Sequence, residues 1–408
     1  MKLHLFPIAA TLASMMAVAC DSDAMGPDDP KPVICPTSID MAIIEKQNDF
    51  AFSYLKLAPA DDNGNSVVSP LSLSMALSIA ANGASGETLD EILDALGFDN
   101  SSLSDVNSLN SMLMEVLPQM DSKTRLSLAN TLWIHKDFPV NESFKDLCNN
   151  TYKAEANSID MYSDEAVGII NRWAEKHTAG LIKNFISEAP CARLAIMNAL
   201  YFKGKWADKF PKSETMRRKF HNADGSTPEV EMMHDSRHTC AAWEDDGVTI
   251  VSLPYGNGSF RMTLLLPDEG ITTEQCAAAL TDAKWNDWQR HLSQEGTISL
   301  TIPKFDIESE NQPIEMLQSL GMRRAFTGNA EFPGISPQPL AISKIRQRTH
   351  VIVDEEGTEA AAVTDIEFDL TAPSPGGIRT LVIDRPFIFV ISESDTSSIL
   401  FMGKINNL

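Results

Sequence analysis

Apolar and polar side chains alternate without a break between Glu355 and Thr371. One set of alternate positions is small or apolar: Thr358, Ala360, Ala362, Thr364, Ile366, Phe368 and Leu370. The positions between them are mostly acidic, and this period of two is that of a β-strand with one buried face. Two prolines follow soon after Ala372, and a strand ladder cannot continue through them. We therefore predict a strand that ends at Thr371.

The residues at the start of this strand favour movement. Gly357 allows backbone angles that other residues avoid, and the small side chains after it, Thr358, Ala360 and Ala362, fit between existing strands. One interpretation is a mobile segment that inserts into a sheet. The other is an ordinary antiparallel strand followed by a Pro/Gly turn. Alternation does not separate the two, because it does not report when a strand forms.

Helical patterns dominate the first half of the chain, and strand patterns dominate the second. The predicted helices are residues 39–57, a segment that begins with a Thr88–Glu91 capping box and stops at Gly97, and residues 169–177. The predicted strands include RLSLANTLWI, VTIVSL, FRMTLLL and PFIFVI. Since no internal repeat or linker interrupts the body, this order indicates one large α+β domain and disfavours two domains.

The amino terminus has the pattern of a cleaved signal. Lys2 precedes an apolar run from Leu5 to Ala19, which is shorter than the roughly 20 residues that a transmembrane helix needs. The run ends at Cys20 and resembles a bacterial lipoprotein signal, although Ala17 departs from the larger aliphatic residue that is usual at its position. A plain secretory signal cut nearby is the alternative.

These features divide the chain into three parts. Residues 1–19 are the expected signal peptide, residues 20–34 a lipidated Cys20 with an acidic, proline-bearing tether, and residues 35–408 the folded domain. We expect a lipid-anchored protein of the cell envelope that faces the periplasm or the cell surface. A secreted protein is the alternative.

Composition narrows the range of partners. The 408 residues are 43% hydrophobic and 22% charged, which is typical of a globular protein with a large core. The formal net charge of -23 argues against binding to nucleic acid or to an anionic membrane surface, because phosphate contacts need clustered Lys and Arg. Membrane contact is expected only through the lipid on Cys20.

The short sequence signals of catalysis are absent. The chain contains no G-x-S-x-G, no H-E-x-x-H and no phosphate-binding glycine loop, so we predict neither an enzyme nor a bound cofactor. The best metal-ligand candidates are His234, His238 and Cys240 in HDSRHTC, but their Asp, Ser and Arg neighbours indicate a solvated loop, and we predict no metal site. The five cysteines beyond Cys20 form no C-x-x-C, and we predict that most are buried thiols.

Several stretches together resemble the serpin family, and they cover nearly all of residues 35–408. In chain order they include NSVVSPLSLSMALSIAANGASGETLDEI, NALYFKGKWADKF, EVEMM, LPYGN with LLLPDEG, IPKF, EEGTEAAAVT, DRPFIFVI and ILFMGKI. A motif such as LPY is weak alone. This order and spacing, with EEGTEAA near the carboxyl end, is highly specific.

The resemblance implies an α+β fold with three β-sheets, eight or nine helices and an exposed reactive-centre loop. It also implies a monomeric protease inhibitor that acts as a suicide substrate. The protease cleaves the loop, which inserts into the central sheet and traps the protease in a covalent 1:1 acyl-enzyme complex. The alternative within the family is a non-inhibitory binding or carrier protein. Such members tend to carry bulky, charged or proline residues in the hinge, and the positions of TEAAA on the face to be buried, Thr358, Ala360 and Ala362, have none, so we expect inhibition.

Position by position, the resemblance assigns five residues to the hinge of the loop: Glu355, Gly357, Thr358, Ala360 and Ala362. It places three where the central strands part: Ser69, Ser72 and Asn198. Trp206 is expected under the top of the central sheet. Gln347 departs from the family, in which a histidine is usual at this distance before the first hinge glutamate. Glutamine still donates and accepts hydrogen bonds, but it does not titrate.

The resemblance also brackets the reactive bond. Counting from Glu355 with the family's usual spacing places this bond between Thr371 and Ala372, in agreement with the alternation. The runner-up is the bond between Leu370 and Thr371, because the stretch that follows Ala372 is longer than in many members. Thr371 suits elastase-like or subtilisin-like serine proteases and Leu370 suits chymotrypsin-like ones, with cysteine proteases as a further target class.

We expect the mature protein to begin at Cys20 and to partition into detergent through its lipid. Globomycin should block removal of residues 1–19, and mass spectrometry of the mature amino terminus should identify a lipidated Cys20. Processing that continues in globomycin, or a mature terminus at another residue, would contradict the lipoprotein prediction.

Overall fold

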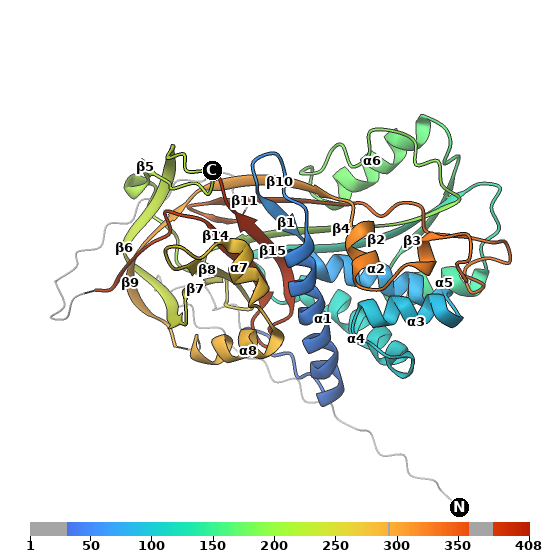
Figure 1. Cartoon of the computed structure of the whole chain (residues 1–408), viewed down its shortest axis with the longest axis horizontal. Coiled ribbons are helices and arrows are strands. Elements are labelled where there is room, and N and C mark those ends of the chain that lie inside the picture. Colours follow the sequence, from blue (N-terminus) through green and yellow to red (C-terminus); the bar gives the residue numbers. More distant parts are fainter. Residues whose placement is uncertain (1–30, 293, 359–377) are drawn as a thin grey trace, which may run out of the picture.

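The computed structural model describes residues 31–292, 294–358 and 378–408 (Figure 1). The α-helices of this part of the chain are α1 (Ser38–Leu57), α2 (Pro70–Gly83), α3 (Gly86–Ala95), α4 (Leu103–Val116), α5 (Glu142–Tyr152), α6 (Glu165–His177), α7 (Thr273–Ala278), α8 (Asp282–His291) and α9 (Ile314–Ser319). None of them is both long enough and apolar enough to cross a membrane.

Helix α1 matches the predicted helix at 39–57 and starts with a capping box. The Asp40 N–H donates to Thr37 Oγ1 (3.1 Å), and the Thr37 N–H donates to Asp40 Oδ2 (2.8 Å). These two bonds satisfy amide groups that have no partner inside the helix. Helix α6 likewise contains the predicted segment 169–177.

The capping box predicted for α3 is wrong. This helix begins at Gly86, so Thr88 and Glu91 lie inside it. Thr88 Oγ1 accepts a hydrogen bond from the Glu331 N–H (3.0 Å), and Glu91 Oε2 accepts one from the Arg323 N–H (2.7 Å). Both side chains therefore hold α3 against a distant part of the chain, a role that a local spacing rule does not detect.

A six-stranded sheet spans the molecule and contains the strands on either side of the predicted hinge. Its order is β10 (Phe305–Asn311), β11 (Gln347–Asp354), β12 (Gly357–Thr358), β4 (Leu194–Lys205), β2 (Thr124–His135) and β3 (Glu155–Ile159). Neighbouring strands are antiparallel except β2 and β3. Figure 1 shows α6 on the opposite side of this sheet from α2.

Strand β2 shows how its alternation serves both faces of the sheet. Leu132 and Ile134 point into the main core, as the sequence predicts. Trp133 points the other way, into a smaller cluster with Trp173 of α6, and the two indole rings meet edge to face at 6.3 Å. The polar break Asn130 is buried, and its Nδ2 donates to the Tyr152 carbonyl (2.9 Å).

The remaining strands form two sheets that share β6 (Glu229–Asp245). The path is β1 (Ser66–Val68), β15 (Ile399–Ile405), β14 (Phe387–Glu393), β8 (Phe260–Pro267), β7 (Val248–Tyr255), β6, β9 (Gly296–Pro303) and β13 (Thr380–Val382), with β5 (Met216–Lys219) also paired to β6. The later half of β6 pairs with β7 and the earlier half with β9. The predicted α+β fold with three sheets and eight or nine helices is confirmed for the described residues.

The main core is centred on β14 and β15, in which every residue is buried. Phe387, Phe389 and Phe401 are among its largest fully buried side chains. A strand buried on both faces is encoded by a continuous apolar run, and PFIFVI and SILFMG are runs of this kind.

Candidate functional site

The predicted hinge lies in the six-stranded sheet, where the chain turns from the end of β11 into β12, between β11 and β4. Gly357 pairs with Asp354 on one side and with Lys205 on the other, and Thr358 pairs with Val353 and Gly204. Of the segment 355–371 in which the alternation predicts a strand, the structure describes residues 355–358, and Glu355 and Glu356 form a turn while Gly357 and Thr358 form a strand. They already occupy a strand position inside the sheet.

Glycine is required at position 357. Its φ of +149° lies in a region that other residues rarely adopt, and a Cβ there would fall 2.0 Å from the Gly204 carbonyl oxygen. Gly204 is equally confined, because its own Cβ would lie 2.7 Å from the ring of Tyr255. Two glycines on neighbouring strands thus allow β12 to approach β4 closely.

Thr358 is buried and held by an aromatic pair. It is 2% exposed, and its Oγ1 lies 2.6 Å from the Tyr255 hydroxyl. Burial raises the pKa of Tyr255, so the phenol stays protonated and able to donate. The Tyr255 ring stacks on Trp206 with centroids 4.5 Å apart. Trp206 in turn donates from Nε1 to the Asp354 carbonyl (2.9 Å), which fixes the end of β11.

Two glutamates at the turn between β11 and β12 are anchored by cations. Glu355 accepts from Thr215 Oγ1 (2.7 Å) and lies 3.3 Å from Lys304 Nζ, while Glu356 lies 2.8 Å from Lys209 Nζ. Burial opposes ionisation of Glu355, but Thr215 and Lys304 hold the pKa of its carboxyl below the ordinary value. The hydrogen bond from Lys209 holds the pKa of Glu356 down as well. Both carboxylates are therefore ionised at neutral pH.

A second cluster surrounds Gln347 at the start of β11. Its Oε1 accepts from the Ser69 N–H (2.9 Å) and from the Tyr54 hydroxyl (3.0 Å), and its Nε2 donates to the Ser69 carbonyl (2.8 Å). Ser69 Oγ donates onward to the Leu400 carbonyl (3.0 Å). A carboxamide carries its donor and acceptor on one carbon and can pair with both backbone groups of one residue, whereas an imidazole carries its two nitrogens on different sides of a ring. The paired contacts of Gln347 with the Ser69 N–H and carbonyl therefore depend on the carboxamide group, which histidine lacks.

The other predicted residues divide into those placed nearby and those outside the described chain. Ser72 is buried in the first turn of α2, close in sequence to Ser69 at the N-cap position of this helix. Asn198 lies in β4 with its backbone opposite Asn130. The predictions that fall outside the described residues are Cys20, Ala360, Ala362, Leu370, Thr371 and Ala372.

The structure thus gathers the predicted residues into two groups and not one. One group, where β11 ends and β12 begins, contains Gly357, Thr358 and Trp206. The other, at the start of β11, contains Ser69 and Gln347. Six steps along β11 lead from Gln347 to Val353, which is roughly 20 Å at about 3.3 Å per residue.

Sequence reasoning missed the partners of the hinge. Tyr255, Thr215, Lys304 and Lys209 are far from Glu355 in sequence, and no local pattern connects them. Three of them nonetheless stand in motifs that carried the family resemblance: Tyr255 in LPYGN, Lys304 in IPKF and Lys209 in NALYFKGKWADKF. These motifs therefore contain partners of the hinge, but which residues they contact becomes clear only once the strands are paired in the sheet.

The prediction for HDSRHTC is wrong about its structure. The segment is part of β6 and not a solvated loop. His234 Nδ1 lies 3.0 Å from Thr301 Oγ1, whereas His238 faces Asp235 at 3.2 Å, so the two histidines have different partners. Cys240 is buried, as are Cys148 and Cys276, which agrees with the prediction that most thiols are buried.

Comparison with known proteins decides the family. The family model described as "Serpin (serine protease inhibitor)" matches residues 45–408. The chain belongs to the serpin family. It is 33% identical to Iripin-3 of Ixodes ricinus over an alignment of 386 residues that covers 92% of this chain and 97% of that protein.

Solved structures agree. The native-state crystal structure of tengpin, a thermophilic serpin, matches with a TM-score of 0.83 at 29% identity and covers 93% of this chain and 97% of its own. The latent state of tengpin matches with a TM-score of 0.76 at 30% identity and covers 90% and 98%. Serpins are generally inhibitors of serine proteases and not catalysts, and as a family they form covalent complexes with their target proteases.

Replacing Gln347 with methionine should destabilise this serpin by about 2 to 6 kcal/mol. The Ser69 N–H and the Tyr54 hydroxyl would each lose their acceptor in a buried place, at about 1–3 kcal/mol per group. Urea unfolding followed by circular dichroism measures the change. The exposed Gln338→Met variant is the matched control and should unfold like the wild type. Equal stability of Gln347→Met and wild type would show that this cluster does not hold the strands together.

Proposed function

We propose that this serpin inhibits its target protease as a suicide substrate, with the loop of residues 359–377 cleaved and then drawn between β11 and β4. The observation that carries this proposal is β12. Among the described residues, backbone pairing between β11 and β4 passes only through Gly357 and Thr358. Beyond these two residues the flanking strands retain pairing positions that a growing strand would fill.

The register of β12 sets where later residues of the loop would pair. Thr358 is opposite Gly204 of β4 and Val353 of β11, and both pairings are antiparallel. Continued without a bulge, this register brings Phe368 opposite Leu194, at the far end of β4. The alternating segment is thus long enough to run the whole length of the sheet.

An apolar pocket lies at that far end, between α2 and the chain that leads into β11. Its lining includes Leu73, Leu77, Leu194 and Ile345. Thr358 faces the core, and residues an even number of positions later share its face, so Phe368 would enter on the side of this pocket. The large side chains at even positions, Ile366, Phe368 and Leu370, would each contribute roughly 1.5–3 kcal/mol as an upper bound. Insertion would therefore be strongly downhill.

The acidic face of the loop would meet basic residues in the same register. The pairing of Val353 with Thr358 continues to Arg346 opposite Asp365 and Lys344 opposite Glu367. Opposite charges on directly paired residues stabilise a sheet by roughly 0.2–1 kcal/mol each. Arg346 and Lys344 now pair with Glu310 (3.1 Å) and Glu188 (3.3 Å). Charge on both strands favours this register over one shifted by a residue.

One further observation supports inhibition over a carrier role. The hinge residues Gly357 and Thr358 fit within the sheet, whereas a larger side chain at these positions would be strained. The non-inhibitory alternative predicts cleavage without a trapped protease.

We also propose that this inhibition takes place outside the cytoplasm. The apolar run before Cys20 supports export, and the acidic stretch 20–34 supports a tether between a lipid anchor and the inhibitory domain. The globomycin experiment tests this part of the proposal separately from inhibition.

Incubation with elastase-like, subtilisin-like and chymotrypsin-like proteases should give an SDS-resistant 1:1 complex with at least one of them. Mass spectrometry of the carboxyl-terminal peptide released from this complex identifies the reactive bond. A peptide that starts at Ala372 supports the bond after Thr371, and one that starts at Thr371 supports the runner-up. A peptide that starts at Thr380 would contradict both, and complete cleavage without any complex would favour the non-inhibitory alternative.

Thr358→Arg should turn the inhibitor into a substrate. Thr358 is already buried between the strands, so an arginine would have to leave the sheet and take β12 with it, because an unpaired buried charge costs too much. We expect a native circular dichroism spectrum, a stability loss of about 1 kcal/mol for each lost hydrogen bond, and loop cleavage without an SDS-resistant complex.

The control for this variant is Thr227→Arg, an exposed threonine in the turn between β5 and β6. It adds the same charge far from the hinge and should form the complex normally. Undiminished complex formation by Thr358→Arg would exclude insertion as the mechanism.

A further inference from the structure

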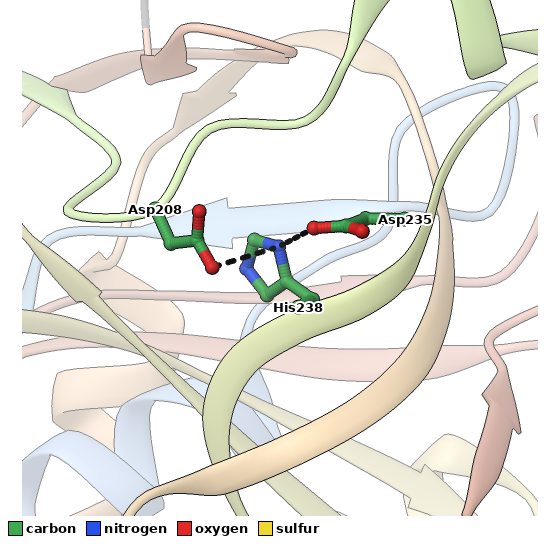
Figure 2. Close-up of side chains that lie close together, drawn as sticks. All are labelled: Asp208, Asp235 and His238. Atoms are coloured by element: carbon green, nitrogen blue, oxygen red, sulfur yellow. Dashed lines mark hydrogen bonds and ion pairs between the residues drawn. The ribbon is translucent and has the colours of Figure 1, made fainter. Parts of the chain in front are cut away.

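Three metal-ligating side chains converge beside β6: Asp208, Asp235 and His238 (Figure 2). His238 Nδ1 lies 3.2 Å from Asp235 Oδ2 and 4.0 Å from Asp208 Oδ2. One ligand atom from each residue lies within 4.8 Å of the others. Ligands of a tetrahedral ion at about 2.0–2.1 Å are separated by roughly 3.3 Å, so small side-chain adjustments suffice to bind one.

A bulge in β6 brings Asp235 and His238 together. Asp235 is opposite Leu300 of β9 and His238 is opposite Ile298, so three steps along β6 match two steps along β9. Residues three apart in a regular strand point to opposite faces, and the extra residue turns these two to the same side. Asp208 reaches them from the segment that follows β4.

Each of the three side chains is held by a second contact. Asp208 Oδ2 accepts from the Thr239 N–H (2.8 Å), and Asp235 Oδ1 accepts from the Arg237 N–H (2.8 Å). The ring of His238 stacks on Phe210 with centroids 4.2 Å apart. Contacts of this kind orient metal ligands before the ion arrives.

Charge and exposure at the cluster favour a cation. In the part of the chain that the structure describes, the single ion-pair partner of either carboxylate is His238, so two acidic side chains face one imidazole. The imidazole side chain is 1% exposed and that of Asp208 40%. The histidine thus lies at the closed side of the cluster and Asp208 at the open side, through which an ion and its water enter.

We propose that Asp208, Asp235 and His238 form a binding site for a divalent transition-metal ion, with zinc as the best fit. His238 Nδ1 and one oxygen from each aspartate supply three ligands, and water supplies the fourth. One nitrogen and two oxygens suit zinc, which accepts mixed tetrahedral sets. Calcium and magnesium prefer six or more oxygens and should bind poorly.

The site lies next to the hinge but does not depend on the inhibitory mechanism. The Trp206 N–H donates to the Glu356 carbonyl (2.9 Å) and the Phe210 N–H to the Glu355 carbonyl (3.1 Å). Asp208 lies midway between these two donor residues in the sequence. An ion that ties Asp208 to β6 would hold this segment in place. Zinc should therefore slow the opening of both hydrogen bonds.

Isothermal titration of the EDTA-treated full chain with zinc chloride tests the site. Wild type should bind one equivalent, calcium chloride should give no matching heat, and Asp208→Asn should bind zinc at least about tenfold more weakly. His234→Gln is the matched control, because His234 lies in the same strand but faces Thr301, and its affinity should equal that of wild type. No zinc binding, or binding lost in His234→Gln and kept in Asp208→Asn, would overturn the proposal.

Hydrogen exchange gives a readout at the hinge itself. Saturating zinc should slow exchange of the Trp206 and Phe210 amides in wild type and leave them unchanged in Asp208→Asn. The substitution is at a half-exposed position and keeps the side-chain shape, so it tests the site even where His238→Gln does not fold. Unchanged exchange of both amides in wild type would overturn the link to the hinge.

Discussion

The pairing of two residues, Gly357 and Thr358, between β11 and β4 is the interaction on which the rest of the site depends. Buried backbone amides and carbonyls require partners, and among the described residues it is these two that supply them between β11 and β4. Trp206 fixes the end of β11, and cations fix the acidic turn that follows it. All of these contacts hold the segment from which one strand, β12, begins.

Much of this arrangement is predictable because it is encoded by period and by single residues. Alternation places Thr358 on a buried face, where the structure has it, and the absence of a side chain at Gly357 marks the point of closest approach. The continuous apolar runs of β14 and β15 identify the core for the same reason. Local chemistry determines these features, and so a reader of the sequence can find them.

The failures share a physical cause, which is that tertiary contacts override local rules. The Thr88–Glu91 spacing matches a helix start, but both side chains bind backbone amides brought close by folding. HDSRHTC has the composition of a loop, but pairing with β9 makes it a strand, and one extra residue in that strand decides which side chains meet. Tyr255 could not be assigned to Thr358 for the same reason.

The sharing of β6 by two sheets has a mechanical consequence. Its earlier half is bonded to β9 and its later half to β7, so each sheet is bonded to the same continuous backbone. Sliding of one sheet past the other would stretch that backbone along its length, which covalent geometry resists, whereas rotation about the strand axis needs only small changes in φ and ψ. Relative motion of the two sheets is therefore confined to torsion of β6 where its pairing passes from β9 to β7, between Cys240 and Ala241.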